Sequence, residues 1–199
     1  MGSQSYVIRG GAQGRERLRL LSDVMGPATR ALLAEVGIAS GASCLDVGCG
    51  GGDVTLELAR LVGPGGRVRG VDLDATKLEI ARCELAERGV ANVAFEVRDV
   101  SAWEPDDPFD VVYARFVLTH LADPAALLAT LHRHVRPGGV VIVEDIDFRG
   151  HFAEPPCPAL DRYVELYTRS VAARGADANI GPRLPGLLRT AGFADVRMR

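Results

Sequence analysis

Apolar residues along the chain alternate between short continuous runs and longer stretches with helical spacing. The short runs predict five strands, at residues 43–47, 67–72, 93–97, 109–113 and 140–144. Between them, apolar positions recur every three or four residues, which is typical of helices that bury one face. Strands that alternate with helices in this way predict a mostly parallel sheet covered by helices on both faces.

Turn and capping residues set the expected limits of the helices. Asp74 and Asp123 stand where N-caps are needed, before predicted helices at residues 75–88 and 124–135. Gly89 closes the first, and the segment 136–139 (Arg-Pro-Gly-Gly) stops the second in a tight turn rather than a ligand site. The N-terminal helix is expected to be interrupted at Gly26-Pro27.

The chain is expected to form one domain, because 199 residues suffice for a single core. Within it we expect an N-terminal helical segment or flap at 1–40, a core at 41–145, a lid or acceptor-side insertion at 146–182, and a last segment at 183–199. The insertion holds an irregular, proline-rich stretch and a helix at 159–174. The last segment holds a helix at 184–191 and a strand at 194–198.

Composition and charge narrow the class of partner. A net charge of −3 gives no broad attraction for nucleic acid or anionic lipid, so neither is expected. No stretch is long enough to span a bilayer and no secretory leader is recognisable, which predicts a cytoplasmic protein. Cys44 and Cys49 lack a second pair of ligands, so no metal site is expected, and the cysteines are expected to be buried thiols.

A glycine-rich turn follows the first predicted strand. Gly48, Gly50 and Gly52 alternate after Asp46 and precede a helix, which allows a ligand to lie against bare main chain. A dinucleotide would need a third glycine near the helix N-terminus. Asp53 or Thr55 stands there instead, and an acid opposes a pyrophosphate.

Four segments together resemble the class I S-adenosylmethionine-dependent methyltransferases. They are the glycine turn, Gly70–Asp74, Arg98–Val100 and Phe109–Arg115, in that order, and LHRHVRPGG before the fifth strand also matches. The match covers about residues 44–144 and is similar to the small-molecule branch of ubiquinone and menaquinone methyltransferases. The resemblance implies a Rossmann-like, doubly wound sheet in three α/β/α layers.

The resemblance also implies which residues bind S-adenosylmethionine and release S-adenosylhomocysteine. Asp72 accepts hydrogen bonds from the ribose hydroxyls, while Asp99 and the Val100 amide contact the adenine. Arg115 borders the methionyl part, although a structural salt bridge remains the alternative. The complete expected set is Asp46, Gly48, Cys49, Gly50, Gly52, Asp72, Leu73, Asp99, Val100, Ala114 and Arg115.

Methyl transfer from a sulfonium needs alignment and exclusion of water more than a dedicated catalytic residue. If the acceptor requires a base, His120 is the best-placed candidate, ahead of His151, Tyr163 and Tyr167, although a packing role for His120 remains the alternative. His132 and His134 are expected to face solvent.

The acceptor side carries fewer signals. Aromatic and apolar residues of the insertion could line a site for a small organic acceptor or close a core: Phe148, Phe152, Tyr163, Leu166 and Tyr167. The base-methylation motif of the family is absent after the fourth strand, where Ala114–Val117 stands. The stretch Tyr6–Arg17 could fold over the cofactor and supply Arg17 to its carboxylate, or it could be a mobile terminus.

The chain departs from the family at its end. The family sheet has seven strands, whereas this sequence stops inside the expected sixth, so the C-terminal strands look incomplete. A shortened chain, a different pairing of strand six, or a homodimer that supplies the missing strand are the alternatives. Three functions stay open: a small-molecule methyltransferase, a module that binds S-adenosylmethionine without transferring its methyl, and an NAD-dependent oxidoreductase.

Overall fold

The computed structural model describes residues 11–199, with side chains from residue 14 onward. These residues form two compact units. The core unit comprises residues 11–114 and 133–142, and the C-terminal unit comprises residues 115–132 and 143–199.

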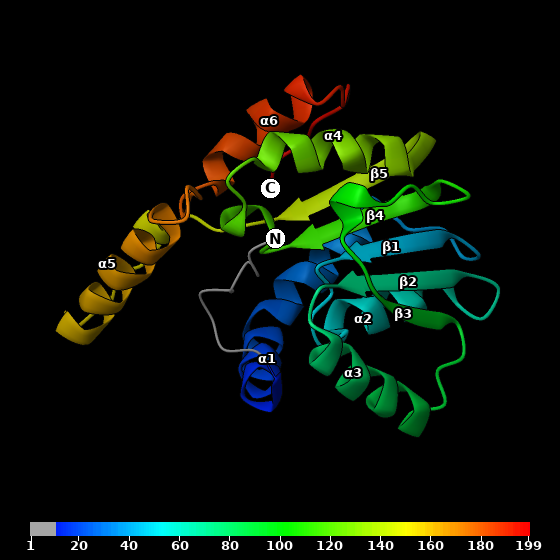
Figure 1. Ribbon diagram of the computed structural model, residues 1–199, viewed down its shortest axis with the longest axis horizontal. Coiled ribbons are helices and arrows are strands. Elements are labelled where there is room, and N and C mark those ends of the chain that lie inside the picture. The colour runs from blue at the N-terminus through cyan, green and yellow to red at the C-terminus, as the bar shows by residue number, and fades with distance from the viewer. Residues whose placement is uncertain (1–10) are drawn as a thin grey trace. The chain divides into compact units, whose positions relative to one another are not determined.

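The five predicted strands form one sheet in the order β3-β2-β1-β4-β5 (Figure 1). Their bounds are β1 Ser43–Val47, β2 Arg67–Asp72, β3 Val93–Val97, β4 Phe109–Arg115 and β5 Val135–Glu144. The pairs β1–β2, β1–β4 and β2–β3 are parallel. Val47 pairs with both Val71 and Ala114, so the carboxyl ends of the three middle strands lie at one edge of the sheet.

Three helices complete the core unit: α1 Gly11–Val36, α2 Asp53–Val62 and α3 Ala75–Glu87. α2 packs on β1 and β2, α3 packs on β3, and α1 packs on both helices (Figure 1). Every residue of β1 is buried, as expected of a central strand covered on both faces. The Asp74 side chain accepts hydrogen bonds from the Thr76 and Lys77 amides, which confirms it as the N-cap of α3.

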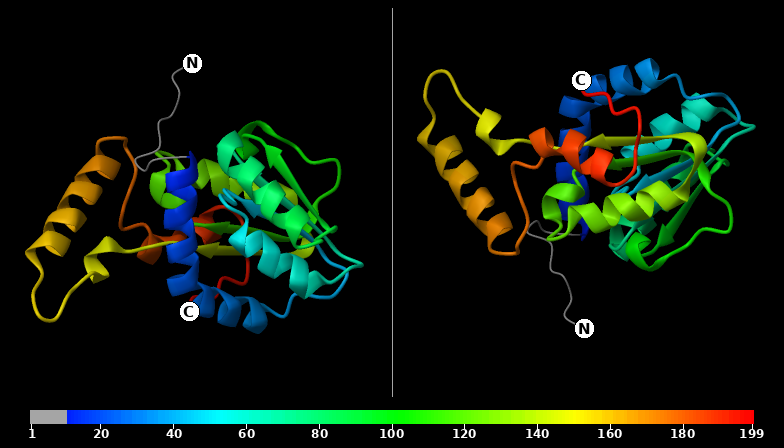
Figure 2. Two further views of the ribbon diagram at one scale, coloured as in Figure 1. Left: turned by 90° about the horizontal axis from the view of Figure 1, so that it is seen from below. Right: turned by 90° about the horizontal axis from the view of Figure 1, so that it is seen from above.

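The expected interruption at Gly26-Pro27 is wrong, because α1 continues through Pro27. Proline removes one helical hydrogen bond and bends the axis, but a bent helix can continue when both halves are packed. Figure 2 shows α1 changing direction along its length. Packing of Leu33, which is 1% exposed, holds the second half against the core.

Two further expectations at chain turns are wrong. β5 begins at Val135, directly after α4 (Pro124–His134), so Gly138 and Gly139 lie within the extended segment instead of before it. The positive φ of Gly138, 79°, accommodates the change of direction there. Residues 194–198 form no strand, because no segment of the described chain pairs with them.

The C-terminal unit has a small core of its own. Phe148, Val171 and Ala178 are buried together, and Ile146, Val164 and Tyr167 pack against them. Residues of η3 (Phe148–Gly150) and α5 (Pro158–Ala172) supply most of this core, and α6 (Leu184–Thr190) follows after η4 (Gly181–Arg183). The Phe148 amide donates to the Ala178 carbonyl, which joins the two ends of the insertion.

None of the helices within residues 11–199 is both long enough and apolar enough to cross a membrane.

Candidate functional site

The turn at residues 48–52 joins β1 to α2 at the edge where the strands end. Gly48, Gly50 and Gly52 have φ values of 66°, 56° and 78°, a backbone conformation that residues with a Cβ adopt only with strain. An added Cβ at Gly52 would also lie 2.5 Å from the Phe95 ring. Glycine is therefore required here by both conformation and space.

Four amides of this turn are already hydrogen-bonded within the protein. Gly48 and Cys49 donate to the Val71 carbonyl, and Gly52 donates to the Cys49 carbonyl. Gly50 donates to the Asp72 carboxylate over 2.9 Å. A phosphate-binding turn needs several backbone amides aimed at the anion, and these four are committed elsewhere.

The structure weakens the argument against a dinucleotide that the sequence made from the charge of Asp53. Its carboxylate is paired with Arg15 at 2.8 Å, so its negative charge is balanced and would oppose a pyrophosphate less than the sequence suggests. The occupied amides are thus the stronger structural argument against a dinucleotide.

Asp72 lies at the end of β2 and is 6% exposed. One carboxylate oxygen accepts the Gly50 amide and the other accepts the Asp74 amide, each over 2.9 Å. A carboxylate offers about four acceptor positions, so acceptor capacity remains for two further donors. The acid is thus fixed in orientation and still able to accept hydroxyl groups.

Asp46 holds α2 against β1. It is 2% exposed and accepts a 2.6 Å hydrogen bond from the Thr55 hydroxyl in the first turn of α2. This short contact orients the start of the helix that follows the glycine turn.

The end of β3 contributes residues beside Asp72. The Arg98 amide donates to the Asp72 carbonyl over 3.0 Å, which places the next residues along the same sheet edge. Asp99 is exposed, and its side chain accepts the Ser101 amide to begin η1 (Val100–Ala102). Leu73 follows Asp72 at this edge and is 52% exposed.

The two cysteines near the turn are unreactive by environment. Burial, together with the Asp46 and Asp72 carboxylates, raises the pKa of Cys49 well above its ordinary value. Burial also raises the pKa of Cys44 to about 12. Among residues that the structure describes, no group of His, Cys, Asp and Glu is arranged to hold a metal ion.

The segment after β4 crosses from one unit to the other. Ala114 is fully buried in the core unit, whereas Arg115 belongs to the C-terminal unit and lies over the Phe116 ring at 5.7 Å. Phe116 has a φ of 55°, the one positive value among non-glycine residues in the described part of the chain. Such strain in a bulky residue is uncommon and concentrates at functional sites.

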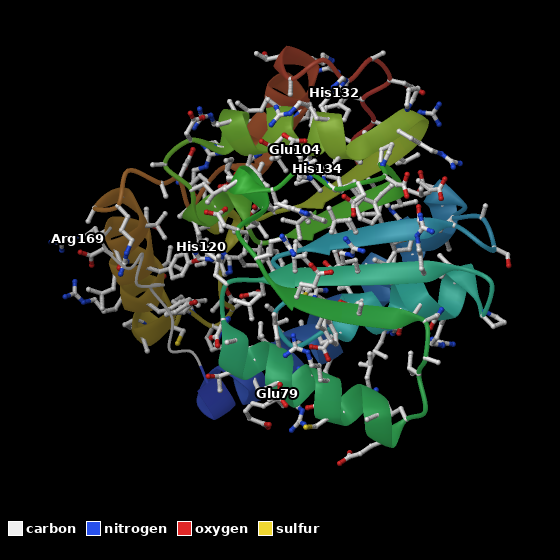
Figure 3. All side chains as sticks on the ribbon, turned by 45° about the vertical axis from the view of Figure 1, so that its right-hand side comes forward. Glu79, Glu104, His120, His132, His134 and Arg169 are labelled. Carbon is white, nitrogen blue, oxygen red and sulfur yellow. The ribbon has the colours of Figure 1, made fainter. Side chains whose placement is uncertain are left out.

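His120 ends the short η2 helix (Leu118–His120) and is partly buried (Figure 3). The preceding Thr119 is held on both sides: its amide donates to Asp145 over 3.0 Å and its hydroxyl donates to the Asp177 carbonyl over 3.1 Å. The position of His120 is therefore set by a rigid turn.

Asp145 is a residue that the sequence reasoning missed. It lies directly after β5 and accepts amides from the η2 turn and from Ile146. Burial raises the pKa of Asp145 to about 6, although these amide hydrogen bonds act in the opposite direction. Its place at a strand end, like that of Asp72, was the available signal.

The other histidines have structural surroundings. His132 is exposed, as expected, and its ring meets Phe193 edge-on at 4.9 Å. The expectation that His134 faces solvent is wrong: it is fully buried and hydrogen-bonded to the Trp103 carbonyl at 2.8 Å (Figure 3). Burial lowers its pKa, so it packs as a neutral ring.

The aromatic and apolar residues of the insertion divide between a buried core and an exposed surface. Phe148 is buried and stacks on Tyr167 at 4.2 Å and on His151 at 4.6 Å, so it closes the small core. Phe152, Tyr163 and Leu166 are 87%, 52% and 47% exposed. These three leave an apolar surface on the C-terminal unit.

The expected flap at Tyr6–Arg17 is only partly covered, since residues 6–10 lie outside the described part. Gly11–Arg17 begins α1, and Arg17 is exposed on it. Arg15, which the sequence reasoning did not select, is the buried arginine of this segment, with 3% exposure. Helical spacing does not single it out, because Arg15 shares a face with the apolar Leu18 and Arg17 shares one with Leu21.

This sheet order, with a glycine turn after β1 and an acid ending β2, defines the Rossmann-like folds, to which the methyltransferases that use S-adenosylmethionine belong. Comparison with known proteins agrees, because a family model described as a methyltransferase domain matches residues 38–172. The chain belongs to this methyltransferase family, whose members use S-adenosylmethionine as methyl donor.

Two curated relatives and one solved structure illustrate the match. A ubiquinone/menaquinone biosynthesis C-methyltransferase of Hahella chejuensis (strain KCTC 2396) is 34% identical over 67% of this chain and 52% of its own length. A trans-aconitate 2-methyltransferase of Azoarcus sp. (strain BH72) is 40% identical over 59% of this chain and 44% of its own length. The chain thus spans about half the length of the curated relatives it matches.

The solved structure is a Haemonchus contortus phosphoethanolamine N-methyltransferase 2 in complex with phosphomonomethylethanolamine and S-adenosylhomocysteine. It is 26% identical, with a TM-score of 0.63 over 83% of this chain and 36% of its own.

Proposed function

We propose that this protein transfers the methyl group of S-adenosylmethionine to a small organic acceptor by in-line displacement. The observation that carries the proposal is Asp72, an oriented acid at the end of β2 that is hydrogen-bonded to the glycine turn. Membership of the methyltransferase family supports the reaction class.

The residues at the sheet edge suit the adenosyl part of the cofactor. Asp72 would accept the two ribose hydroxyls with its remaining acceptor positions. Leu73 would pack against the adenine, the Val100 amide would donate to a ring nitrogen, and Asp99 would accept the exocyclic amine. The half-exposed Leu73 side chain supports this assignment, because a bound ring would cover it.

The remaining predicted residues would surround the methionyl part. Gly48, Gly50 and Gly52 would offer bare main chain there, and Cys49 a small side chain. Asp46 would orient the helix that follows, and Ala114 lies beside β1. Arg115 would meet the methionyl carboxylate. Cys49 supports this role as a compact neutral group, since its raised pKa keeps it protonated near neutral pH.

Bound S-adenosylmethionine would supply an electrophilic methyl group. The protein would align the acceptor opposite the sulfur and keep water away. His120 would take a proton from the acceptor where one must leave, and the Asp145-held turn would fix the direction of its ring. The insertion 146–182 would close over the acceptor as a lid.

A small acceptor is supported by the relatives and by the surface of the insertion. The relatives are named for ubiquinone and menaquinone biosynthesis and for trans-aconitate, and the solved structure holds phosphomonomethylethanolamine. Phe152, Tyr163 and Leu166 provide apolar surface that a small organic molecule could contact.

Calorimetric titration with S-adenosylmethionine, S-adenosylhomocysteine and NADH tests the cofactor assignment. We expect both adenosyl ligands to bind and NADH not to bind. Asp72→Ala should abolish binding, whereas Asp74→Ala, which removes a neighbouring acid that caps α3, should preserve it. Binding of NADH alone would refute the proposal.

Transfer is tested with S-adenosylmethionine labelled in its methyl group and a deproteinised cell extract divided by size. Label that enters the small-molecule fraction supports the proposed acceptor class. Label only in macromolecules would contradict it, and adenosyl binding with no transfer to either fraction would favour a module that binds without catalysis.

A further inference from the structure

An ion-pair cluster around the buried Arg15 joins the three helices of the core unit. Arg15 of α1 donates two hydrogen bonds to Asp53 of α2, over 2.8 and 2.9 Å. It also donates two to Glu84 of α3, over 3.2 and 2.8 Å, and Glu84 accepts a further bond of 2.7 Å from Arg19. One guanidinium thus bridges α2 and α3.

The geometry of this cluster is specific. Burial alone would lower the pKa of Arg15, but the hydrogen bonds with Glu84 and Asp53 raise it, so the residue stays charged. The hydrogen bond from Arg15 likewise lowers the pKa of Glu84. A buried guanidinium is costly unless its donors are satisfied, and a two-pronged carboxylate contact fixes direction as well as charge.

The cluster lies directly against the glycine turn. A Cβ added at Gly51 would lie 2.5 Å from Nη1 of Arg15, and one at Gly50 would lie 3.0 Å from Cδ1 of Leu18. Asp53 is the first residue after the turn. Because the Gly50 amide also holds Asp72, one line of contacts runs from Arg15 through the turn to that acid.

A groove runs along the outer side of α2. It has a volume of about 1330 Å³, and both Arg15 and Asp53 line it, but none of the predicted cofactor residues does. The Arg15 side chain therefore lies between this groove and Gly51. Its removal would admit water to the back of the turn.

We propose that Arg15 is a positioning residue of the cofactor site: its bonds to Asp53 and Glu84 hold the glycine turn, and with it Asp72, in the binding geometry before the cofactor arrives. The inference rests on the proposed function of this turn. If it is correct, loss of Arg15 makes the glycine turn mobile and thereby weakens cofactor binding. A site that is ordered in only a fraction of the molecules has its affinity reduced by that fraction.

Calorimetric titration of Arg15→Met with S-adenosylhomocysteine tests the proposal at a temperature where the variant is folded by circular dichroism. Methionine keeps the length and apolar stem but removes the charge. We expect the Kd to rise roughly tenfold, as for a turn ordered in about one molecule in ten. Arg15→Lys, which cannot make the two-pronged contact, should restore only part of the affinity.

Arg60→Met is the matched control. Arg60 lines the same groove and pairs with Glu57 on α2 at 2.9 Å. It is exposed and lies outside the ion-pair cluster that meets the glycine turn. Its replacement removes the same charge and should leave the Kd unchanged. An equal loss of affinity in both variants would overturn the positioning role, since it would reflect net charge alone.

Hydrogen exchange of the Gly50 amide separates positioning from a merely structural role. Without ligand, Arg15→Met should exchange this amide faster than the wild type, and S-adenosylhomocysteine should restore protection. A variant that melts at a lower temperature but keeps the wild-type Kd and Gly50 protection would overturn the proposal.

If Arg15→Met does not fold, Asp53→Asn weakens the same contact from the other side, and the same two measurements are made on it. Failure of the cofactor assignment would be seen separately, as wild-type affinity in Asp72→Ala.

Discussion

At the scale of single residues, three acids at strand ends have distinct surroundings. Asp46 accepts a hydroxyl from α2, Asp72 accepts two backbone amides, and Asp145 accepts amides from η2 and from Ile146. All three follow the same pattern of an acid after an apolar run. The sequence can therefore locate such acids but cannot rank them, because their neighbours come from distant segments.

Asp145 should make stability depend on pH. Its pKa is raised to about 6 in the folded protein, so between pH 4 and 6 the folded state holds a proton that the unfolded state has lost. Stability should therefore fall as pH rises through this window, by ~3 kcal/mol from this group. Urea unfolding at pH 4.5 and pH 7 measures the change.

Asp145→Asn is the comparison that isolates this effect. Asparagine does not titrate and resembles the protonated acid, so the variant should lack this pH dependence, and the stability of the wild type relative to Asp145→Asn should fall as pH rises. Carboxylates with lowered pKa values, such as Glu84 and Asp110, act with the opposite sign but equally in both proteins. A difference in stability between the two proteins that stays constant from pH 4 to 6 would show that the pKa of Asp145 is not raised.

At the scale of elements, the glycine turn depends on how α2 is attached to β1. The Thr55 hydroxyl supplies that attachment through its 2.6 Å bond to the buried Asp46. Thr55→Val keeps the shape but removes the donor, which should cost roughly 1.5–3 kcal/mol as for other bonds to charged groups. Chemical denaturation measures the loss.

Thr55→Ser provides the matched control, because it removes the methyl group and keeps the hydroxyl. It should retain most of the stability that Thr55→Val loses. Equal losses in the two variants would mean that packing of the methyl group, and not the bond to Asp46, holds the helix.

Local signals explain which elements the sequence could predict. The first three strands match the predicted bounds, since each is a short apolar run between turn residues. The fourth extends two residues further, to Arg115. The errors involve residues whose outcome depends on distant packing. Pro27 lies inside a helix that packs on α2 and α3, and residues 194–198 have the composition of a strand but pair with no strand in the described part of the chain.

The candidate site shows the same division. Asp72 and the glycines could be located because they follow strands directly, and parallel strands bring their carboxyl ends to one edge. Arg15 could not be selected by type, since α1 also carries Arg17 and Arg19. Only the fold shows that Arg15 meets Gly51 and Asp53, while Arg17 is exposed.

At the scale of the whole molecule, the two units hold different parts of the proposed reaction. The residues expected to bind the adenosyl group belong to the core unit, whereas Arg115, His120 and the insertion belong to the C-terminal unit. Adenosyl binding and acceptor chemistry can therefore be altered by separate substitutions. Binding of the adenosyl group should report on the core unit.

Trp103 provides a probe of that unit, because it is the single tryptophan in the sequence and its ring lies edge-on to His134 at 5.5 Å. S-adenosylhomocysteine at 100 times its Kd should stabilise the folded state by ~2.7 kcal/mol. For a chain of this length that corresponds to a rise in Tm of roughly 5–10 °C, followed by Trp103 fluorescence.

The same melting experiment discriminates between cofactors. NADH should leave the Tm unchanged, because the amides that a pyrophosphate would need are bonded to Val71, Asp72 and Cys49. Asp72→Asn should lose most of the shift caused by S-adenosylhomocysteine, since the amide keeps the shape of the side chain but not its charge or full acceptor capacity. A comparable shift with NADH in the wild type would mean that the turn opens to free its amides, and the adenosyl assignment would then have to be abandoned.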